Sequence, residues 1–263
     1  MEKNIKLLLL ICFILYQNNA NSQNYKIEYY TYTKNTVDTT GIRSYLIFNN
    51  SNSVFVWKSI NNSIKKNKEI SDESDTKITF KKVINDTIGT RVYNDYSKKQ
   101  IILREPLLEN NFKVIDYKVK INWKIENEFK KIGNLKCQKA YGVFRGRNYI
   151  AWFTTTFPLP TGPWKLQGLP GLILEAYDEN KEVNFIFKSL NRYSKEKEKI
   201  RIPLSKDAIT IKEFVKKKDD IHRKIINQYL SKLPRGVKVK SSHKAKRKGI
   251  ETKFEWEEEI KED

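Results

Sequence analysis

Few side chains in this sequence have the type and spacing that catalysis or metal binding requires. Two histidines occur, His222 and His243, and neither has the second histidine or the cysteine pair that a zinc site needs. No G-x-S-x-G motif presents a serine nucleophile, and no glycine-rich phosphate-binding motif occurs. We therefore expect no metal and no cofactor, and we interpret both histidines as surface residues.

Two carboxylates, Glu175 and Asp178, remain as candidates for acid and base roles in a hydrolase. Their spacing places them on opposite faces of an extended strand, which favours structural roles. Cys137 comes just before an apolar segment, where a small buried hydrophobic residue is the common role and a reactive thiol the alternative. These patterns favour a protein without enzymatic activity, with a carboxylate-dependent hydrolase as the alternative.

Aromatic residues suggest a binding site instead. Trp152 and Trp164 flank a proline-rich stretch, and tryptophan combines a large apolar body with a polar tip that suits ligand or partner contact. The alternative is that they belong to the core. If they line a concavity, we expect Arg147 and Lys165 at its mouth, where they would receive an anionic head group.

Most of the chain predicts β-strands that position these residues. In NYKIEYYTYTK the residues Tyr25, Ile27, Tyr29 and Thr31 alternate with Lys26, Glu28 and Tyr30, as in a half-buried strand. Short connections favour antiparallel neighbours. Further strands are predicted at 43–49, 53–59, 77–84, 90–96, 100–104, 119–126, 138–144, 149–156, 172–178 and 182–190, with a polar loop at 59–76.

The stretch GPWKLQGLPGLILEAYD forms a stiff corner before an apolar strand. Four of the seven prolines lie between Phe157 and Gly171. In Leu169-Pro170-Gly171-Leu172 the proline and the glycine occupy the positions that a type II turn prefers, so we expect a positive φ at Gly171. The segment LILEAY should then enter the interior of the sheet.

The same corner carries a resemblance to a known family. Gly168, Leu169, Pro170, Gly171, Leu172 and Ile173 spell the signature of the GLPGLI family, and the match is specific over about 133–178. Its other parts are CQKA at 137–140, GR at 146–147, AWFT at 151–154 and GP at 162–163. The resemblance implies an exported protein of Bacteroidetes-type bacteria that often accompanies an outer-membrane transport receptor. It transfers no catalytic residue, because the family has no established activity.

The chain after Pro203 has a different pattern. Apolar residues recur at helical intervals and predict a helix at about 207–232, with Ser205 or Asp207 as the residue that caps its start. A charged tail follows at about 236–263, basic first and acidic at its end. We interpret the tail as a solvated arm, with Phe254 and Trp256 packing back as a last strand as the alternative.

The first 22 residues have the features of a secretory signal peptide. Lys3 and Lys6 accompany an apolar run over 5–16, and Ala20 and Ser22 suit cleavage before Gln23. The run is too short to span a membrane, so we expect no transmembrane segment after cleavage. Lipid attachment at Cys12 is disfavoured, because large residues precede it. The expected location is the periplasm, the cell envelope or the exterior.

Charge adds a constraint on partners. The 263-residue chain has a formal net charge of +20, which favours encounters with anionic surfaces. Much of this charge is expected on a solvated surface, and the expected export disfavours nucleic acid as a ligand.

Together these features predict one mostly β domain from residue 23 onward, an antiparallel curved open sheet or incomplete barrel with a C-terminal helix. The favoured function is an exported, non-enzymatic binding or envelope-accessory protein. Its partner would be an amphiphilic ligand or an outer-membrane protein, and an adhesion module for anionic surfaces is a further alternative.

Overall fold

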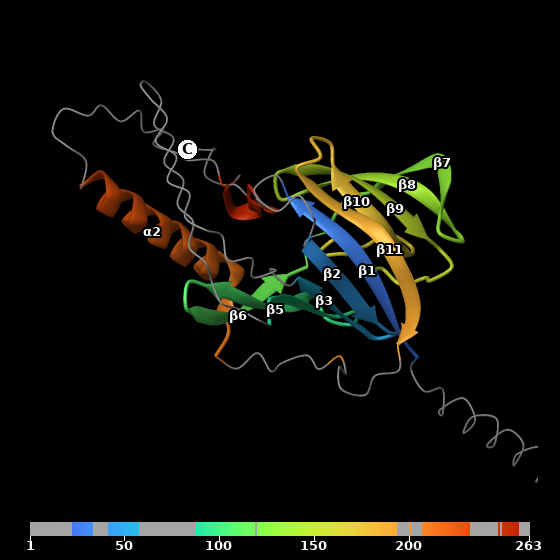
Figure 1. Ribbon diagram of the computed structural model, residues 1–263, viewed down its shortest axis with the longest axis horizontal. Helices are drawn as coiled ribbons and strands as arrows, with labels where there is room; N and C mark the ends of the chain where they lie inside the picture. Colours follow the sequence, from blue (N-terminus) through green and yellow to red (C-terminus); the bar gives the residue numbers. More distant parts are fainter. Residues whose placement is uncertain are drawn as a thin grey trace, which may run out of the picture.

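A computed structural model describes residues 23–33, 42–57, 88–118, 120–193, 200, 207–231, 247 and 249–257. It contains one twelve-stranded sheet, a helix and a short 3₁₀ segment (Figure 1). The elements are β1 (Asn24–Thr33), β2 (Ile42–Phe48), β3 (Asn52–Trp57), β4 (Thr90–Asp95), β5 (Gln100–Leu107), β6 (Asn110–Tyr117), β7 (Lys124–Ile132), β8 (Leu135–Phe144), β9 (Arg147–Thr154), β10 (Leu172–Asp178), β11 (Val183–Tyr193), β12 (Ile209–Thr210), α2 (Ile211–Leu230) and η2 (Glu255–Glu257).

The sheet is open, and its order is β12-β6-β5-β4-β3-β2-β1-β11-β10-β9-β8-β7. Every pairing between described strands is antiparallel except that of β12 with β6. The predicted fold class is therefore confirmed as a mostly β open sheet with a C-terminal helix. Short hairpins join β2 to β3, β4 to β5, β5 to β6, β7 to β8, β8 to β9 and β10 to β11, which suits the antiparallel arrangement.

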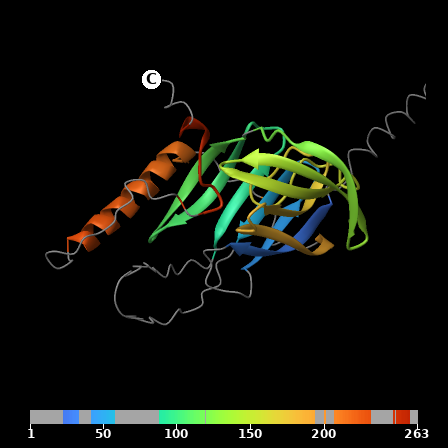
Figure 2. The same cartoon turned by 90° about the horizontal axis from the view of Figure 1, so that it is seen from above.

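The two limbs of the sheet, β2–β6 and β7–β10, are joined through β1 and β11 and curl toward one another (Figure 2). In β1 the buried residues alternate, and all of them point to the face that carries the main core. We call this the inner face and the opposite one the outer face. The largest fully buried side chains include Tyr29, Phe48, Phe55, Phe153 and Phe185.

The proline-rich corner between β9 and β10 lies over the inner face. Leu166 and Leu169 are fully buried there, and Phe157 packs edge-on against Tyr25 at 5.1 Å and Phe48 at 5.9 Å. The backbone N–H groups of Leu172 and Ile173 donate hydrogen bonds back to the corner. As predicted, the following strand β10 lies in the interior of the molecule.

The predicted reason for Gly171 is wrong. Gly168 has a positive φ of +94°, whereas Gly171 does not, so no type II turn places it in the left-handed region. What requires glycine is the close approach of β9. A Cβ atom at position 171 would lie 2.2 Å from the Thr154 carbonyl oxygen, which only a shift of the backbone would relieve.

The predicted strand at 119–126 is correct only in its last three residues. Strand β6 ends before it at Tyr117, and β7 begins only at Lys124, so the prediction holds for 124–126 alone. The prediction missed β6, in which Phe112, Val114 and Asp116 share the inner face. Asp116 is buried by pairing with cations distant in sequence. Asp116 interrupts the alternation of apolar and polar residues from which β6 could have been predicted.

Helix α2 begins later than the predicted 207. Thr210 and Glu213 form a capping box: the Glu213 N–H donates to the Thr210 hydroxyl (3.2 Å), and the Thr210 N–H donates to the Glu213 carboxylate (2.8 Å). Asp207 is therefore not the cap. Within the described residues, no helix is both long enough and apolar enough to cross a membrane.

The predicted solvated arm is wrong for 249–257. Phe254 is buried in the core and stacks on Trp256 at 4.6 Å, but this segment ends in the 3₁₀ turn η2 and not in a strand. The predicted signal peptide at 1–22, loop at 59–76 and strand at 77–84, the capping candidate Ser205, His243 and the rest of the tail except Arg247 lie outside the described residues.

Candidate functional site

A buried cluster of charges joins the two limbs of the sheet. Arg145, in the turn between β8 and β9, donates two hydrogen bonds of 2.6 Å to the two carboxylate oxygens of Asp116 on β6. Both side chains are 1% exposed. Such a bidentate pair fixes geometry as well as charge. It therefore connects strands that lie near opposite ends of the sheet order.

Lys165 brings the proline-rich corner into the same cluster. Its Nζ lies 2.8 Å from the Asp116 carboxylate and 2.8 Å from that of Glu251 in the C-terminal segment. Burial alone would lower the pKa of Lys165, but the charges of Glu251 and Asp116 outweigh it and raise the pKa. For Asp116, burial alone would raise the pKa, but Lys165 and Arg145 outweigh burial, so the pKa is lowered.

The C-terminal segment is held by a second arginine. Arg147 pairs with Asp178 (2.6 Å) and Glu182 (3.1 Å), and it also donates to the carbonyl oxygens of Gly249 (2.5 Å) and Ile250 (3.0 Å). Sequence reasoning expected Arg147 and Lys165 at the mouth of a concavity, ready for an anion. Both are buried and form ion pairs with carboxylates of this chain, so in this arrangement they stabilise the fold.

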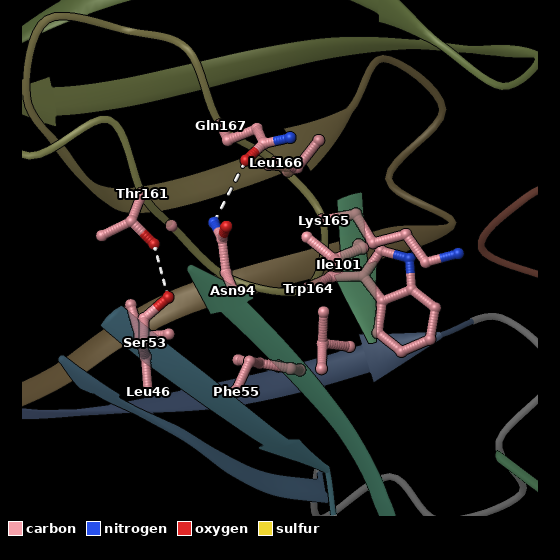
Figure 3. A pocket seen from close by; sticks show the side chains of 12 residues that line it. Leu46, Ser53, Phe55, Asn94, Ile101, Thr161, Trp164, Lys165, Leu166 and Gln167 are labelled. Atoms are coloured by element: carbon pink, nitrogen blue, oxygen red, sulfur yellow. Dashed lines mark hydrogen bonds between the residues drawn. The ribbon is translucent and has the colours of Figure 1, made fainter. Parts of the chain in front are cut away.

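The concavity itself is almost filled. A cavity between the inner face and the corner is lined by Trp164, Lys165, Leu166 and side chains of β2–β5, and its volume of about 10 Å³ leaves room for about one water molecule. Ser53 and Thr161 hydrogen bond across it at 3.1 Å, as do Asn94 and Gln167 (Figure 3). The Lys165 ammonium points out of it, away from Ser53 (Figure 3). Pockets for drug-sized ligands hold at least about 300 Å³.

The two tryptophans do not share a site. Trp164 lies over the inner face, edge-on to Trp57 at 6.0 Å and to Phe55 at 6.5 Å, with a strained backbone φ of +56°. Trp152 follows Ala151 in β9 and points to the outer face, where Lys130 lies 4.5 Å from its ring centre. The structure thus keeps Trp164 near Lys165 and separates Trp152 from both.

The carboxylates proposed for hydrolysis have separate structural partners. Glu175 pairs with Lys130 at 2.5 Å on the outer face, and Asp178 pairs with Arg147 and accepts the Val183 N–H at 2.7 Å. Cys137 is fully buried, and burial raises the pKa of its thiol to about 11, so it is the small core residue that was predicted. His222 is exposed on α2, and the described residues hold no cluster of three or more metal-ligating side chains.

Glu105 is a titratable group that sequence reasoning missed. It lies on β5, partly buried, and accepts a hydrogen bond from the Thr90 hydroxyl at 3.3 Å. Burial raises its pKa to about 7, against the lowering effect of the charges on Lys165 and Lys218. Its position in the alternating pattern of β5, in line with Ile101 and Leu103, was the available signal.

The outer face presents a different chemistry. Directly paired residues of neighbouring strands point to the same face, and successive pairs link Tyr32, Asn184, Tyr177, Ile150 and Tyr141 into one row across β1, β11, β10, β9 and β8. We call these five residues the outer aromatic row. Tyr32 is 36% exposed, and the other four are partly exposed.

Lysines border this row and lie over aromatic rings. Lys139 is 5.2 Å from the ring centre of Tyr141, Lys188 is 5.6 Å from that of Tyr30, and Lys26 is 4.5 Å from that of Tyr45. Cations at these distances are attracted by the ring faces. The sequence carried a signal for this surface, because Lys26, Glu28 and Tyr30 alternate with the core residues of β1.

Comparison with known proteins finds one family and similar solved structures. Residues 145–175 match a family described as a protein of unknown function (Porph_ging). Two solved structures of PNGF-II, in the C2 and P21 space groups, are similar with TM-scores of 0.47 and 0.46 and sequence identities of 16% and 17%; they cover 72% and 66% of this chain. This chain spans only 31% and 29% of theirs. A search of curated proteins finds no match.

Proposed function

We propose that this chain is an exported, non-enzymatic accessory protein of the cell envelope that docks a partner protein on the outer face of its sheet. The outer aromatic row carries this proposal. Tyrosine is enriched at protein interfaces because it offers a large apolar body and a hydrogen-bonding tip, and here three tyrosines lie in one cross-strand row bordered by lysines.

The inner face supports docking over the carriage of a small ligand. Its aromatic side chains already pack against the proline-rich corner, and Arg147 and Lys165 already hold carboxylates of the chain itself. A lipid would therefore have to displace the corner. Native mass spectrometry after purification from the source envelope should find the protein without a bound lipid, and a stoichiometric lipid adduct would argue for the ligand alternative.

We also infer membership of the GLPGLI family. The motif at 168–173 supports this, because each glycine has a structural reason: Gly168 adopts a positive φ, and Gly171 leaves room for the Thr154 carbonyl. The match at 145–175 overlaps the motif. The family implies an exported protein beside an outer-membrane transport receptor, and such a receptor is the partner we propose.

Site-specific cross-linking tests the docking surface. A photoreactive phenylalanine at Tyr177, in the middle of the outer aromatic row, should cross-link to one envelope protein in source cells. The matched control is Tyr117 on β6, which is 64% exposed but lies outside the row. Equal cross-linking at both positions, or none at Tyr177, would contradict the proposed surface.

A further inference from the structure

Helix α2 is supported by the sheet along only its first half. Ile211, Phe214 and Val215 are buried, and Phe214 packs on Phe112 of β6 at 5.7 Å. After Val215 no described side chain of the helix is buried, and Ile226 is 41% exposed. The distal half extends away from the sheet (Figures 1 and 2).

The apolar stripe of the helix nevertheless continues into this unsupported half. At 100° per residue, Ile221, Ile225 and Ile226 lie on the side of the helix that carries Phe214 and Val215. The ten residues from Ile221 to Leu230 extend about 15 Å. The described residues offer no surface that matches an apolar stripe of this length, so the stripe is suited to contact something outside them.

Cations dominate the rest of the helix surface. Lys212, Lys216, Lys217, Arg223 and Lys224 are all exposed. Of the acidic residues, Asp219 is paired with Arg247 at 2.7 Å and Asp220 lies 3.4 Å from Arg223. A helix with an apolar stripe and a basic polar face is typical of helices that lie in the interface of an anionic membrane.

We propose that the distal half of α2, from Ile221 to Leu230, lies in the surface of an anionic lipid membrane. Ile221, Ile225 and Ile226 enter the boundary between head groups and acyl chains, and the flanking lysines contact lipid phosphates. The net charge of +20 is complementary to such a surface and opposes association with a second, equally charged copy. This inference rests on the proposed envelope role and adds a second contact, distinct from the outer aromatic row.

A fluorophore at position 226 reports the contact directly. Ile226→Cys in a Cys12→Ser background, labelled with an environment-sensitive dye, should shift to the blue with vesicles of phosphatidylglycerol and phosphatidylcholine. The native Cys137 is buried and will not compete for the dye. The matched control is Val143→Cys on β8, which is 66% exposed and should stay in an aqueous environment.

The expected results distinguish membrane contact through α2 from membrane contact elsewhere on the protein and from contact with a second copy. Binding should fall at least tenfold with pure phosphatidylcholine vesicles, and at least threefold in Lys217→Gln/Lys224→Gln, with unfolding unchanged. Vesicle binding with no shift at position 226 would overturn the role of α2. A shift that grows with protein concentration in the absence of vesicles would identify a second copy as the occupant and also overturn it. Neither result would affect cross-linking at Tyr177, which tests the proposed docking surface separately.

Discussion

Two carboxylates, each holding two cations, behave differently on the two faces of the sheet. Asp116 on the inner face binds Arg145 and Lys165, and all three side chains are at most 3% exposed. Glu28 on the outer face binds Lys26 and Lys188, and these side chains are 26–34% exposed. The same ionic chemistry therefore stabilises the fold on one face and remains available to a partner on the other.

Removing the inner carboxylate should have the largest effect. Asp116→Ala removes the fully buried one of the two carboxylates that Arg145 and Lys165 share and leaves them with Glu251, so we expect a loss of about 3–5 kcal/mol in the free energy of unfolding. Urea denaturation at pH 7 measures it. The matched control, Glu28→Ala, should cost at most about 1 kcal/mol, because its lysines remain hydrated. Equal losses in the two variants would remove the distinction between the faces.

Gly171→Ala should cause the next largest loss in the free energy of unfolding, about 1–3 kcal/mol. The new Cβ atom would lie 2.2 Å from the Thr154 carbonyl oxygen. Thermal unfolding followed by circular dichroism measures the loss. Gly249→Ala is the control, since its Cβ would meet no atom closer than 3.8 Å. A stable Gly171→Ala variant would mean that the corner is not rigidly held against β9.

Glu105 should make stability fall as pH rises. Its folded pKa of about 7 lies above the ordinary value near 4.5, so the folded state binds the extra proton between these values. The loss builds up as the pH rises from 4.5 through 7 and should reach at most about 3 kcal/mol. Glu105→Gln should therefore be more stable than the native chain at pH 8 and equal to it at pH 4, as measured by urea denaturation. An advantage that does not depend on pH would contradict this assignment.

Lys26→Gln should have the smallest effect on the free energy of unfolding. Its ammonium contacts Glu28 at 3.0 Å and lies over the Tyr45 ring on a hydrated surface, so we expect at most about 0.5 kcal/mol lost on chemical denaturation. A loss comparable to that of Asp116→Ala would show that the outer lysines are structural as well.

The regular strands could be predicted from sequence because alternation reports burial directly. Tyr25, Ile27 and Tyr29 gave β1, and the LILEAY segment gave β10. Strand β6 could not, since its inner position 116 is a charged residue whose partners, Arg145 and Lys165, lie 29 and 49 residues away. The need for glycine at position 171 was recognised, but its reason depends on how closely β9 approaches the corner.

The candidate site was harder to predict than the fold. Arg147 and Lys165 are cations beside aromatic residues, a pattern that suits an anion-binding mouth equally well. Only the tertiary structure brings Asp178 and Glu251 to them. The outer aromatic row depends on the register of five strands, which no local pattern fixes.

Lysine acylation followed by mass spectrometry tests the central claim most directly, that inner cations are bound within the molecule while outer ones serve a partner. Lys165 should stay unmodified in both the purified protein and intact source cells. Lys124, which is 80% exposed and paired opposite Tyr141 of the row, and Lys188 should react in the purified protein and be protected in cells. Rapid modification of Lys165, or equal modification of Lys124 and Lys188 in the two settings, would contradict the account.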